Sequence, residues 1–289
     1  MTDAETAPPF IRIGPDRPES PIVISVPHAG RAYSPALLAA SRLHRTVLES
    51  LEDRLVDRLV WRAVEHGATA FLAQAPRAEI DLNREESEID PALIVPPPPL
   101  ATAPTARARG GLGLIPSRIN GSGAIWRQRI PAAELERRIA EIHRPYHSAL
   151  AQALTAARAR FGVALLLDCH SMPPRREPGG EMGPQIVFGD RHGTACAAPF
   201  MEEALAVARL NGWRARANTP YAGGHIVARH GRPARHVHAL QIELCRAAYL
   251  DVALEAPGRG FAAAAELIAA IAGALETRLL GPDLAVAAE

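Results

Sequence analysis

Short and almost entirely hydrophobic runs recur along the chain, and turn-forming or charged residues bound each of them. Five of these runs have the length of strands, at residues 21–26, 69–73, 163–167, 186–188 and 238–244. Runs that are hydrophobic at nearly every position are typical of strands covered on both faces, as in parallel sheets. We therefore predict strands at these positions and a further short strand at residues 78–82.

Helical periodicity fills several of the intervals between these runs. Leu51, Leu55 and Leu59 recur at helical spacing within residues 48–66, and Gly67 follows as a typical helix terminator. Further helices are predicted at residues 131–160, 199–211 and 260–280. Strands that alternate with helices predict an α/β fold. We expect a three-layer αβα sandwich of the phosphorylase/hydrolase-like kind around a mixed, mostly parallel sheet.

Residues 85–110 interrupt this pattern. They contain an acidic stretch, four consecutive prolines at 96–99 and a segment rich in Ala, Thr, Pro and Arg. Such a composition predicts a Pro-rich surface insertion, not an element of the core. Because a domain typically has roughly 100–200 residues and α/β domains are often larger, we predict that residues 1–289 form a single domain carrying this insertion.

The composition excludes several classes of protein. The chain is 48% hydrophobic and 22% charged, which is ordinary for a globular protein with a core. Its net charge of +1 provides no strong field for binding nucleic acid or an acidic membrane surface. The sequence contains no lysine, which excludes Schiff-base chemistry and a P-loop phosphate site. The expected partner is a small molecule.

The sequence also predicts a compartment. Its three cysteines form no C-x-x-C pair, as is typical of proteins in a reducing environment. The first ten residues lack the basic and hydrophobic regions of a signal peptide. The hydrophobic stretch at 261–274 is too short to span a bilayer and contains Glu266. We therefore expect a cytoplasmic enzyme; the sequence leaves its oligomeric state open.

Polar residues with useful chemistry follow three of the predicted strands. His28 and His170 stand at two strand ends, and Glu243 lies within a late hydrophobic strand. Ligands of open α/β sheets bind beyond the carboxyl ends of the strands. Two histidines and one carboxylate make a zinc site with an open position for water, and Asp53 or Asp57, on the predicted helix at 48–66, could supply the carboxylate. Glu243 would then be the general base.

Structural roles compete with these functional ones. A single histidine at a strand end is more often a hydrogen-bonded structural residue, and Asp53 and Asp57 could lie on a solvated helix face. Glu243 is harder to explain in that way, because burial of an unpaired carboxylate is costly. Cys169 alternates with His170 along the strand, so it points to the opposite face and is expected to be a core residue and not a nucleophile.

Arginines offer a way to bind an anionic substrate. Arg77 and Arg84 bracket the segment RAEIDLNR, which also contains Asn83. Arginine is suited to bidentate binding of a carboxylate. A second candidate is the glycine-hinged turn before His225, which precedes Arg229 and has the character of a mobile loop that closes on an anion.

Five of these segments together resemble one known family. They are SVPHAG at 25–30, IDLNR at 80–84, LLDCHS at 166–171, GGHIVARHGRP at 223–233 and ALQIEL at 239–244. Their order and spacing are similar to those of the N-formylglutamate amidohydrolase family over residues 21–250. That family in turn resembles the zinc carboxypeptidases and aspartoacylases, which share a mixed eight-stranded sheet, one zinc ion, a D-L-N-R substrate segment and a late-strand catalytic glutamate.

The resemblance implies a role for each matching residue. His28, His170 and Asp53 would be the zinc ligands, with Asp57 as the alternative carboxylate, and one zinc ion would bind per chain. The H-x-x-E ligand pair of the carboxypeptidases is absent, since Arg31 stands three residues after His28. The remaining roles are substrate binding and catalysis, and the matching residues are Asn83, Arg84, Glu243 and, as further candidates, Arg77, Arg229 and His225.

The expected reaction is hydrolysis of the amide of an N-acylated acidic amino acid. N-formyl-L-glutamate is the leading substrate, and the products would be formate and glutamate, the last step of one histidine-degradation route. Two alternatives remain open. One is a carboxypeptidase or a deacylase for a larger acyl group, and the other is a metal-free binding protein of the same fold.

Overall fold

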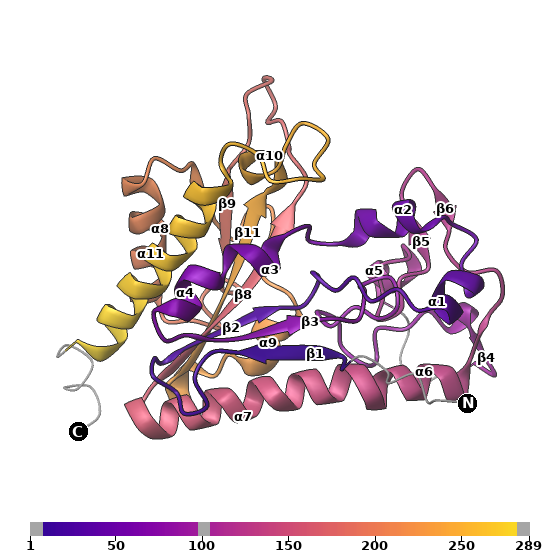
Figure 1. The fold of residues 1–289 in the computed structure, drawn as a ribbon, viewed down its shortest axis with the longest axis horizontal. Coiled ribbons are helices and arrows are strands. Elements are labelled where there is room, and N and C mark those ends of the chain that lie inside the picture. The colour runs from indigo at the N-terminus through magenta and orange to yellow at the C-terminus, as the bar shows by residue number, and fades with distance from the viewer. Residues whose placement is uncertain (1–7, 98–104, 282–289) are drawn as a thin grey trace. The chain divides into compact units, whose positions relative to one another are not determined.

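The computed structural model describes residues 8–97 and 105–281. The chain forms two compact units and passes between them several times, as Figure 1 allows the reader to follow. Unit 1 comprises residues 1–11, 27–52 and 72–148, and unit 2 comprises residues 12–26, 53–71 and 149–289. The expectation of a single domain stays a prediction, and each unit is described below by itself.

A mixed sheet forms the core of unit 2. Its strand order is β1-β3-β2-β8-β11-β9-β10, and β1 and β3 extend across the boundary between the units. The strands are β1 (Phe10–Ile13), β2 (Ile22–Val26), β3 (Thr69–Ala73), β8 (Ala164–Met172), β9 (Ile186–Gly189), β10 (Ala215–Ala217) and β11 (Val237–Cys245). β2 and β11 pair with β8 in parallel, whereas β9 pairs with β11 antiparallel. The sheet is therefore mixed, and among the described residues it has seven strands instead of the eight implied by the resemblance.

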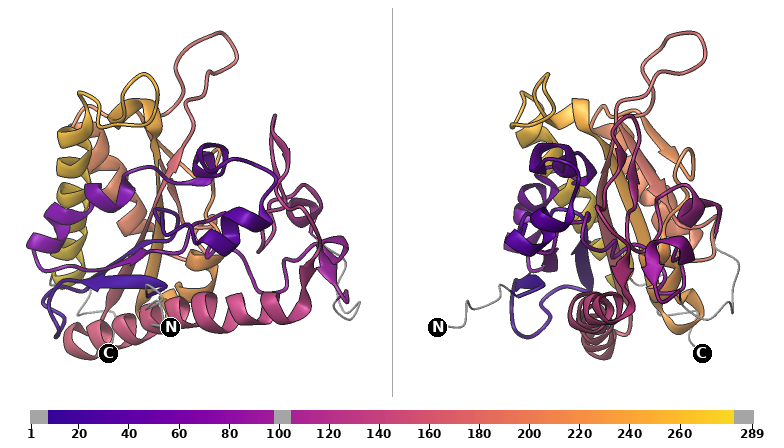
Figure 2. Two further views of the ribbon diagram at one scale, coloured as in Figure 1. Left: turned by 45° about the vertical axis from the view of Figure 1, so that its right-hand side comes forward. Right: turned by 90° about the vertical axis from the view of Figure 1, so that its right-hand side faces the viewer.

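Helices flank this sheet. α11 (Phe261–Leu280) packs against α3 (Val56–Leu59), α4 (Trp61–Glu65), α8 (Ala198–Leu210) and α10 (Arg246–Tyr249). The short helix α9 (His225–His230) packs against β8 and β11 (Figure 2). β2, β8 and β9 are buried at every position, and β11 at every position but its first. The predicted α/β class, a mixed sheet between helices, is confirmed.

Unit 1 contains short helices and two small sheets. Its helical elements are α1 (Pro35–Ala40), α2 (Arg45–Leu48), η1 (Glu49–Leu51), η2 (Pro91–Leu93), α5 (Ala106–Arg109) and α6 (Ala132–Arg138). β4 (Ile94–Val95) pairs with β7 (Ile130–Pro131), and β5 (Arg118–Ile119) pairs with β6 (Gly123–Ala124). A π-turn, η3 (Ile139–His143), joins α6 to the long helix α7 (Arg144–Phe161), which continues into unit 2. The remaining element, η4 (Pro233–Arg235), belongs to unit 2.

The helix expected at residues 48–66 is wrong in its continuity. α2 and η1 end before Glu52, α3 begins only at Val56, and Leu55 between them has a left-handed φ of 60°. The chain passes from unit 1 to unit 2 between Glu52 and Asp53. Both carboxylates are buried, and Glu52 accepts a hydrogen bond from the Tyr33 hydroxyl at 2.8 Å. Asp53 therefore lies in a non-helical segment from which its side chain turns inward.

The strand expected at residues 78–82 is also wrong. The segment is a series of turns, in which the Glu79 N–H donates to the Pro76 carbonyl and the Asn83 N–H donates to the Asp81 carboxylate. Such a local bond from an aspartate to the backbone two residues on is a turn signal. Ile80 and Leu82 are nevertheless buried, so the hydrophobic pattern correctly indicated burial but not the strand.

The predicted insertion at 85–110 is only partly a surface segment. Residues 98–104, which include part of the proline run, lie outside the described residues. On either side of them, Ile94 and Ala108 are fully buried in unit 1.

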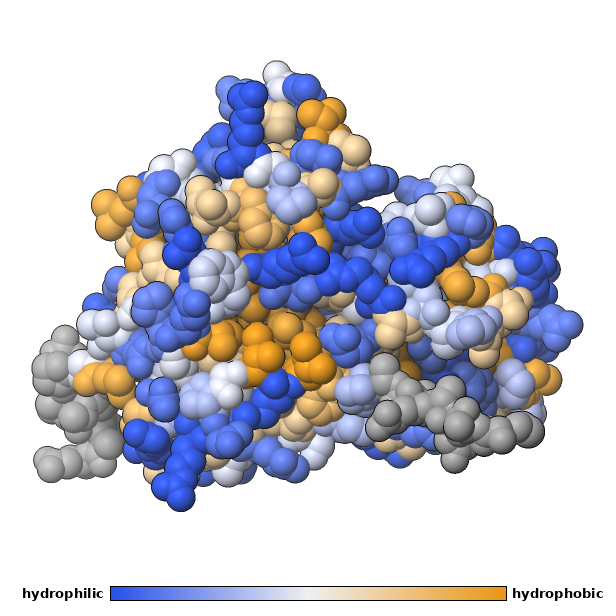
Figure 3. Space-filling model, viewed as in Figure 1, coloured by the Kyte–Doolittle hydropathy of each residue, from blue (hydrophilic) through white to orange (hydrophobic). Residues whose placement is uncertain are grey.

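No helix among the described residues has the length and hydropathy needed to cross a membrane. Hydrophilic side chains predominate on the described surface visible in Figure 3.

Candidate active site

Strand pairing in unit 2 places five polar side chains on one face of the sheet. β8 pairs with β11 so that Asp168 stands opposite Gln241 and His170 opposite Glu243, and Ser25 of β2 stands opposite Asp168. Directly opposed residues of neighbouring strands project to the same face. Glu243 and His170 thus meet across one strand pair. His170 lies inside β8 and not beyond its end, as the hydrophobic run had suggested.

Two carboxylates hold the imidazole of His170. Its Nε2 lies 2.9 Å from Asp168 Oδ2, and its Nδ1 lies 2.9 Å from Asp53 Oδ2. Burial by itself would lower the pKa of His170, but the charges and hydrogen bonds of Asp168 and Asp53 outweigh it and hold the pKa well above the usual value. Ser25 Oγ donates to the second oxygen of Asp168 at 2.8 Å, so the orientation of the histidine is fixed on this side.

Asp53 is the carboxylate that reaches His170. Its other oxygen, Oδ1, accepts a hydrogen bond from Ser171 Oγ at 3.1 Å and lies 3.5 Å from Arg246 Nη2. Arg246 Nε donates to Ser171 Oγ at 3.0 Å, so Asp53, Ser171 and Arg246 each contact the other two. Asp57, the alternative considered from the sequence, lies in the first turn of α3. Asp53 forms an ion pair with this histidine.

Glu243 is 9% exposed and hydrogen-bonded to a neighbour on its own strand. Gln241 Nε2 donates to Glu243 Oε1 at 2.9 Å, and Gln241 Oε1 accepts from the Gly224 N–H at 2.8 Å. His225 and Arg229 belong to α9, which begins directly after Gly224; His225 is half-buried and Arg229 is exposed. The glycine turn expected to be a mobile loop is thus attached to β11.

In unit 1, the Asp81 carboxylate orients His28, as the Asp168 carboxylate orients His170 in unit 2. Its Oδ1 lies 2.7 Å from His28 Nε2 and accepts from the Asn83 N–H at 2.9 Å. Its Oδ2 accepts from Arg77 Nε at 3.0 Å and lies 3.9 Å from Arg84 Nε. Burial would raise the pKa of Asp81, but Arg77, His28 and Arg84 hold it well below the usual value. His28 is therefore paired with a carboxylate that stays ionised.

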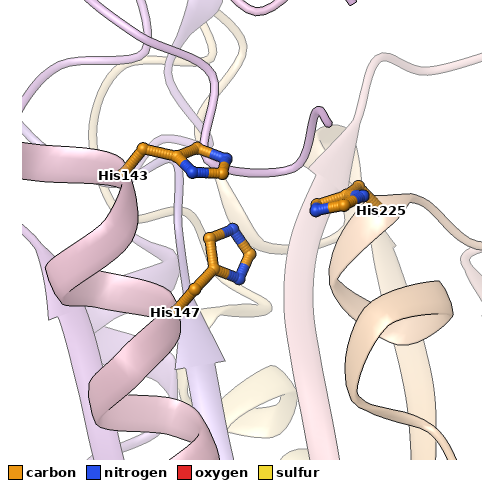
Figure 4. Close-up of side chains that lie close together, drawn as sticks. All are labelled: His143, His147 and His225. Carbon is orange, nitrogen blue, oxygen red and sulfur yellow. The ribbon is translucent and has the colours of Figure 1, made fainter. Parts of the chain in front are cut away.

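The segment that carries Asn83 and Arg84 is fixed by its carbonyl groups. His147 Nε2 donates to the Leu82 carbonyl at 3.0 Å, and His143 Nε2 donates to the Arg84 carbonyl at 2.9 Å. Figure 4 shows these two histidines on successive turns of one helix, with His225 at the start of α9. The ring centroids of His143 and His147 are 4.4 Å apart, and both of these side chains are fully buried.

Two nitrogens of the Arg84 guanidinium donate hydrogen bonds to backbone carbonyls of unit 1. Its Nε donates to the Leu112 carbonyl at 2.8 Å and its Nη1 to the Asn83 carbonyl at 2.9 Å. The described residues make no hydrogen bond to Nη2. Arg77, by contrast, points two of its nitrogens at Asp81. Arg84 is therefore the better placed of the two for a ligand carboxylate.

Several residues of the site were missed by sequence reasoning. Asp168 could have been found, because it stands two residues before His170 in a strand and so shares its face. Gln241 gave the same signal, since it stands two residues before Glu243 in one strand. Asp81 gave no comparable signal, because its partner His28 is distant in sequence. Cys169 is confirmed as a buried core residue, and burial raises the pKa of its thiol.

The donor set fits a metal ion such as zinc. Asp53 and His170 of unit 2 offer one carboxylate and one imidazole, and His28 of unit 1, the third ligand expected from the sequence, offers a second imidazole. Each histidine has one nitrogen held by a buried carboxylate, Asp81 for His28 and Asp168 for His170. Metal-binding histidines almost always have such a partner, which orients the ring and raises its basicity as a ligand.

Comparisons with known proteins agree on one family. A family model described as N-formylglutamate amidohydrolase matches residues 20–250. The N-formylglutamate deformylase of Pseudomonas aeruginosa is 32% identical over 236 residues, which are 80% of this chain and 82% of that protein. That of Pseudomonas putida is 30% identical over the same number of residues, with the same coverage.

Solved structures extend the likeness to the fold. The crystal structure of N-formylglutamate amidohydrolase from Ralstonia eutropha has a TM-score of 0.87 and 32% identity, and the match covers 94% of this chain and 98% of that one. A gene product of Agrobacterium tumefaciens is 18% identical with a TM-score of 0.62, covering 98% of this chain and 96% of that one. This second match bears on the fold alone.

Proposed function

Because the chain belongs to the N-formylglutamate amidohydrolase family, we propose that it hydrolyses N-formyl-L-glutamate to formate and L-glutamate. One observation carries the proposal: Glu243 stands opposite His170 across a parallel strand pair in unit 2. A buried carboxylate beside a histidine already held by two others has no packing role that an apolar residue would not fill better. The reaction would be the last step of one histidine-degradation route.

We propose that His28, Asp53 and His170 hold one zinc ion per chain. The support is chemical: two imidazoles and a carboxylate suit zinc, and both imidazoles have carboxylate partners that orient them. A bound zinc ion would lower the pKa of water and polarise the formyl carbonyl. Arg246 and Ser171 keep the Asp53 carboxylate in one orientation, which prepares it as a ligand before the metal arrives.

Glu243 is the proposed general base and acid. It takes a proton from the attacking water and delivers it to the departing nitrogen of glutamate. His225 is the second candidate for proton transfer or for stabilising the oxyanion, since it follows directly on the residue that Gln241 binds. Asn83 and Arg84 bind a carboxylate of the substrate, and Arg77 and Arg229 are further candidates for the second one.

A substrate screen tests this function. Protein purified without chelator is assayed with the N-formyl, N-acetyl and N-succinyl derivatives of glutamate and aspartate, and its metal content is measured in the same preparation. The proposal predicts the highest kcat/KM for N-formyl-L-glutamate and about one zinc per chain. Faster hydrolysis of the larger acyl groups would favour the deacylase alternative, and absence of hydrolysis with no bound metal would favour the binding-protein alternative.

A further inference from the structure

The side-chain amide of Gln241 has an orientation that chemistry alone determines. Its Oε1 lies 2.8 Å from the Gly224 backbone nitrogen, and its Nε2 lies 2.9 Å from Glu243 Oε1. Because a backbone N–H only donates, the amide oxygen must face Gly224. The amide NH2 group then faces the Glu243 carboxylate and donates to it. A rotated amide would place two acceptors against each other at Glu243 and two donors at Gly224.

This hydrogen bond lies in a buried environment. Gln241 is 4% exposed and Glu243 9% exposed, and the two share a sheet face with their partners Asp168 and His170 on β8. A hydrogen bond to an ionised acceptor in such surroundings is among the strong ones. With Oε1 of Glu243 held by a fixed donor, the carboxylate cannot rotate freely about its last bond.

The amide oxygen of Gln241 accepts its hydrogen bond from a tightly packed part of the backbone. Gly224 caps the start of α9, and the segment before it packs tightly on the end of β9. A Cβ added to Gly189 would lie only 2.7 Å from the Ala222 carbonyl carbon and from Gly223 nitrogen. Gly223 itself has a φ of +113°, which favours glycine. The Gly224 N–H that donates to Gln241 is thus held in place by close backbone packing.

We propose that Gln241 is a positioning residue for Glu243. It donates to the carboxylate that transfers the proton and ties that carboxylate to the start of α9, where His225 follows. The inference rests on the proposed function, because it assigns Gln241 its purpose through the role of Glu243. It predicts an effect on turnover, since the amide donates to the carboxylate that is proposed to transfer the proton.

Two substitutions separate this role from a purely structural one. Gln241→Glu keeps the size and an oxygen for the Gly224 N–H but replaces the donor to Glu243 with a second carboxylate. Gln241→Met keeps the length and removes both hydrogen bonds. We expect each to lower kcat for N-formyl-L-glutamate about 10- to 100-fold, the scale for a lost hydrogen bond to a charged group. KM should stay within about threefold of wild type.

A structural role predicts a different result. If Gln241 served only to hold α9, Gln241→Glu would keep the turnover of wild type, and that result would overturn the inference. Gln185→Glu is a matched control, because the Gln185 amide also accepts from a backbone N–H, that of Arg214, but has no hydrogen bond to Glu243. It should have the kcat of wild type. Should Gln241→Glu not fold, a kcat of Gln241→Met within threefold of wild type overturns the inference equally.

Parallel variants keep this test apart from the test of the function. If Glu243→Gln retains the turnover of wild type, the proposed role of Glu243 is wrong. If Glu243→Gln is inactive while Gln241→Glu is fully active, only the inference about Gln241 falls. The exchange variant Q241E/E243Q restores one carboxylate beside one amide. It should regain the melting temperature of wild type to within a few degrees without regaining turnover, and recovered turnover would contradict the inference.

Discussion

Two aspartates, Asp81 in unit 1 and Asp168 in unit 2, have the same role at the level of single residues. Each accepts a hydrogen bond from one histidine nitrogen, at 2.7 Å for His28 and 2.9 Å for His170, and each is fully buried. Neither carboxylate is left alone, because Arg77 pairs with Asp81 and Ser25 donates to Asp168. Each aspartate thus orients one imidazole, which leaves the opposite nitrogen as the donor for a metal.

Arg84 allows a prediction at the same scale. Arg84→Ala should lower kcat/KM for N-formyl-L-glutamate by about 2–4 kcal/mol of transition-state stabilisation, because a charge-assisted contact to a carboxylate is lost. Arg84→Lys should not restore it, since an ammonium cannot reproduce the guanidinium fork. The measurement is steady-state kinetics, with the exposed Arg107→Ala as control. Equal kcat/KM for wild type and Arg84→Ala would remove Arg84 from substrate recognition.

At the level of elements, α7 and the π-turn before it hold the substrate-binding segment. Pro145 cannot donate a helical hydrogen bond, and just before it the Arg144 N–H bonds the Ile139 carbonyl five residues back. His143, the last residue of this irregular segment, and His147, in the first turns of α7, donate to two carbonyls of the substrate-binding segment. The helix therefore acts as a scaffold for Asn83 and Arg84, although it contains no residue proposed to touch the substrate.

This scaffold predicts a specific pattern of kinetics. His147→Leu should raise KM for N-formyl-L-glutamate about three- to tenfold, because the hydrogen bond to the Leu82 carbonyl is lost. His147→Gln should restore KM to within about twofold, since its terminal nitrogen can donate from a similar position. kcat should change little in both variants. If leucine and glutamine have the same KM, the hydrogen bond has no part in positioning the segment.

The contact between Phe200 of α8 and His238 of β11, in a buried environment, predicts how stability depends on pH. Burial, together with the smaller effect of the nearby His236, lowers the pKa of His238 to about 4. The unfolded chain binds this proton near pH 6.5, so it holds more protons than the folded chain between pH 6.5 and 4. The stability from neutral His238 is present above pH 6.5 and is lost as the pH falls towards 4.

Urea unfolding at pH 7 and pH 5, with chelator present throughout, measures this effect. His238 should contribute about 2 kcal/mol to the loss of unfolding free energy between these pH values. His238→Gln should show a correspondingly smaller loss, because glutamine does not titrate. His192→Asn is the control, since His192 is exposed and its φ of 56° suits asparagine. An unchanged pH dependence in His238→Gln would contradict the assignment.

For the whole molecule, the hydrophobic pattern predicted the sheet because its strands are buried on both faces. The runs at 21–26, 69–73 and 238–244 match β2, β3 and β11 to within a residue or two. The predicted helix at 48–66 and the predicted strand at 78–82 are wrong because polar contacts between distant segments determine the backbone conformation there. Asp53 leaves the helical pattern to reach His170, and Asp81 folds its own segment into turns, because each of these carboxylates has hydrogen-bond partners that a single sequence does not reveal.

Metal binding makes a prediction for the molecule as a whole. An ion that binds only the folded state stabilises it by about 3–4 kcal/mol when its free concentration is several hundred times Kd. Chelator should therefore lower the melting temperature of wild type by several degrees. It should not affect His170→Ala, which is expected to carry no zinc, whereas His192→Asn should behave as wild type. Full zinc content in His170→Ala would remove His170 from the ligand set.

The central claim is that Glu243 transfers the proton in a metal-dependent deformylase. Its most direct test is the turnover of Glu243→Gln on N-formyl-L-glutamate, with zinc content measured on the same sample. Glutamine keeps the shape of the side chain and removes the base. We expect about one zinc per chain and a kcat at least about 100-fold below wild type, the usual scale for a lost acid–base group. A kcat within a few-fold of wild type, or loss of the zinc, would contradict the account.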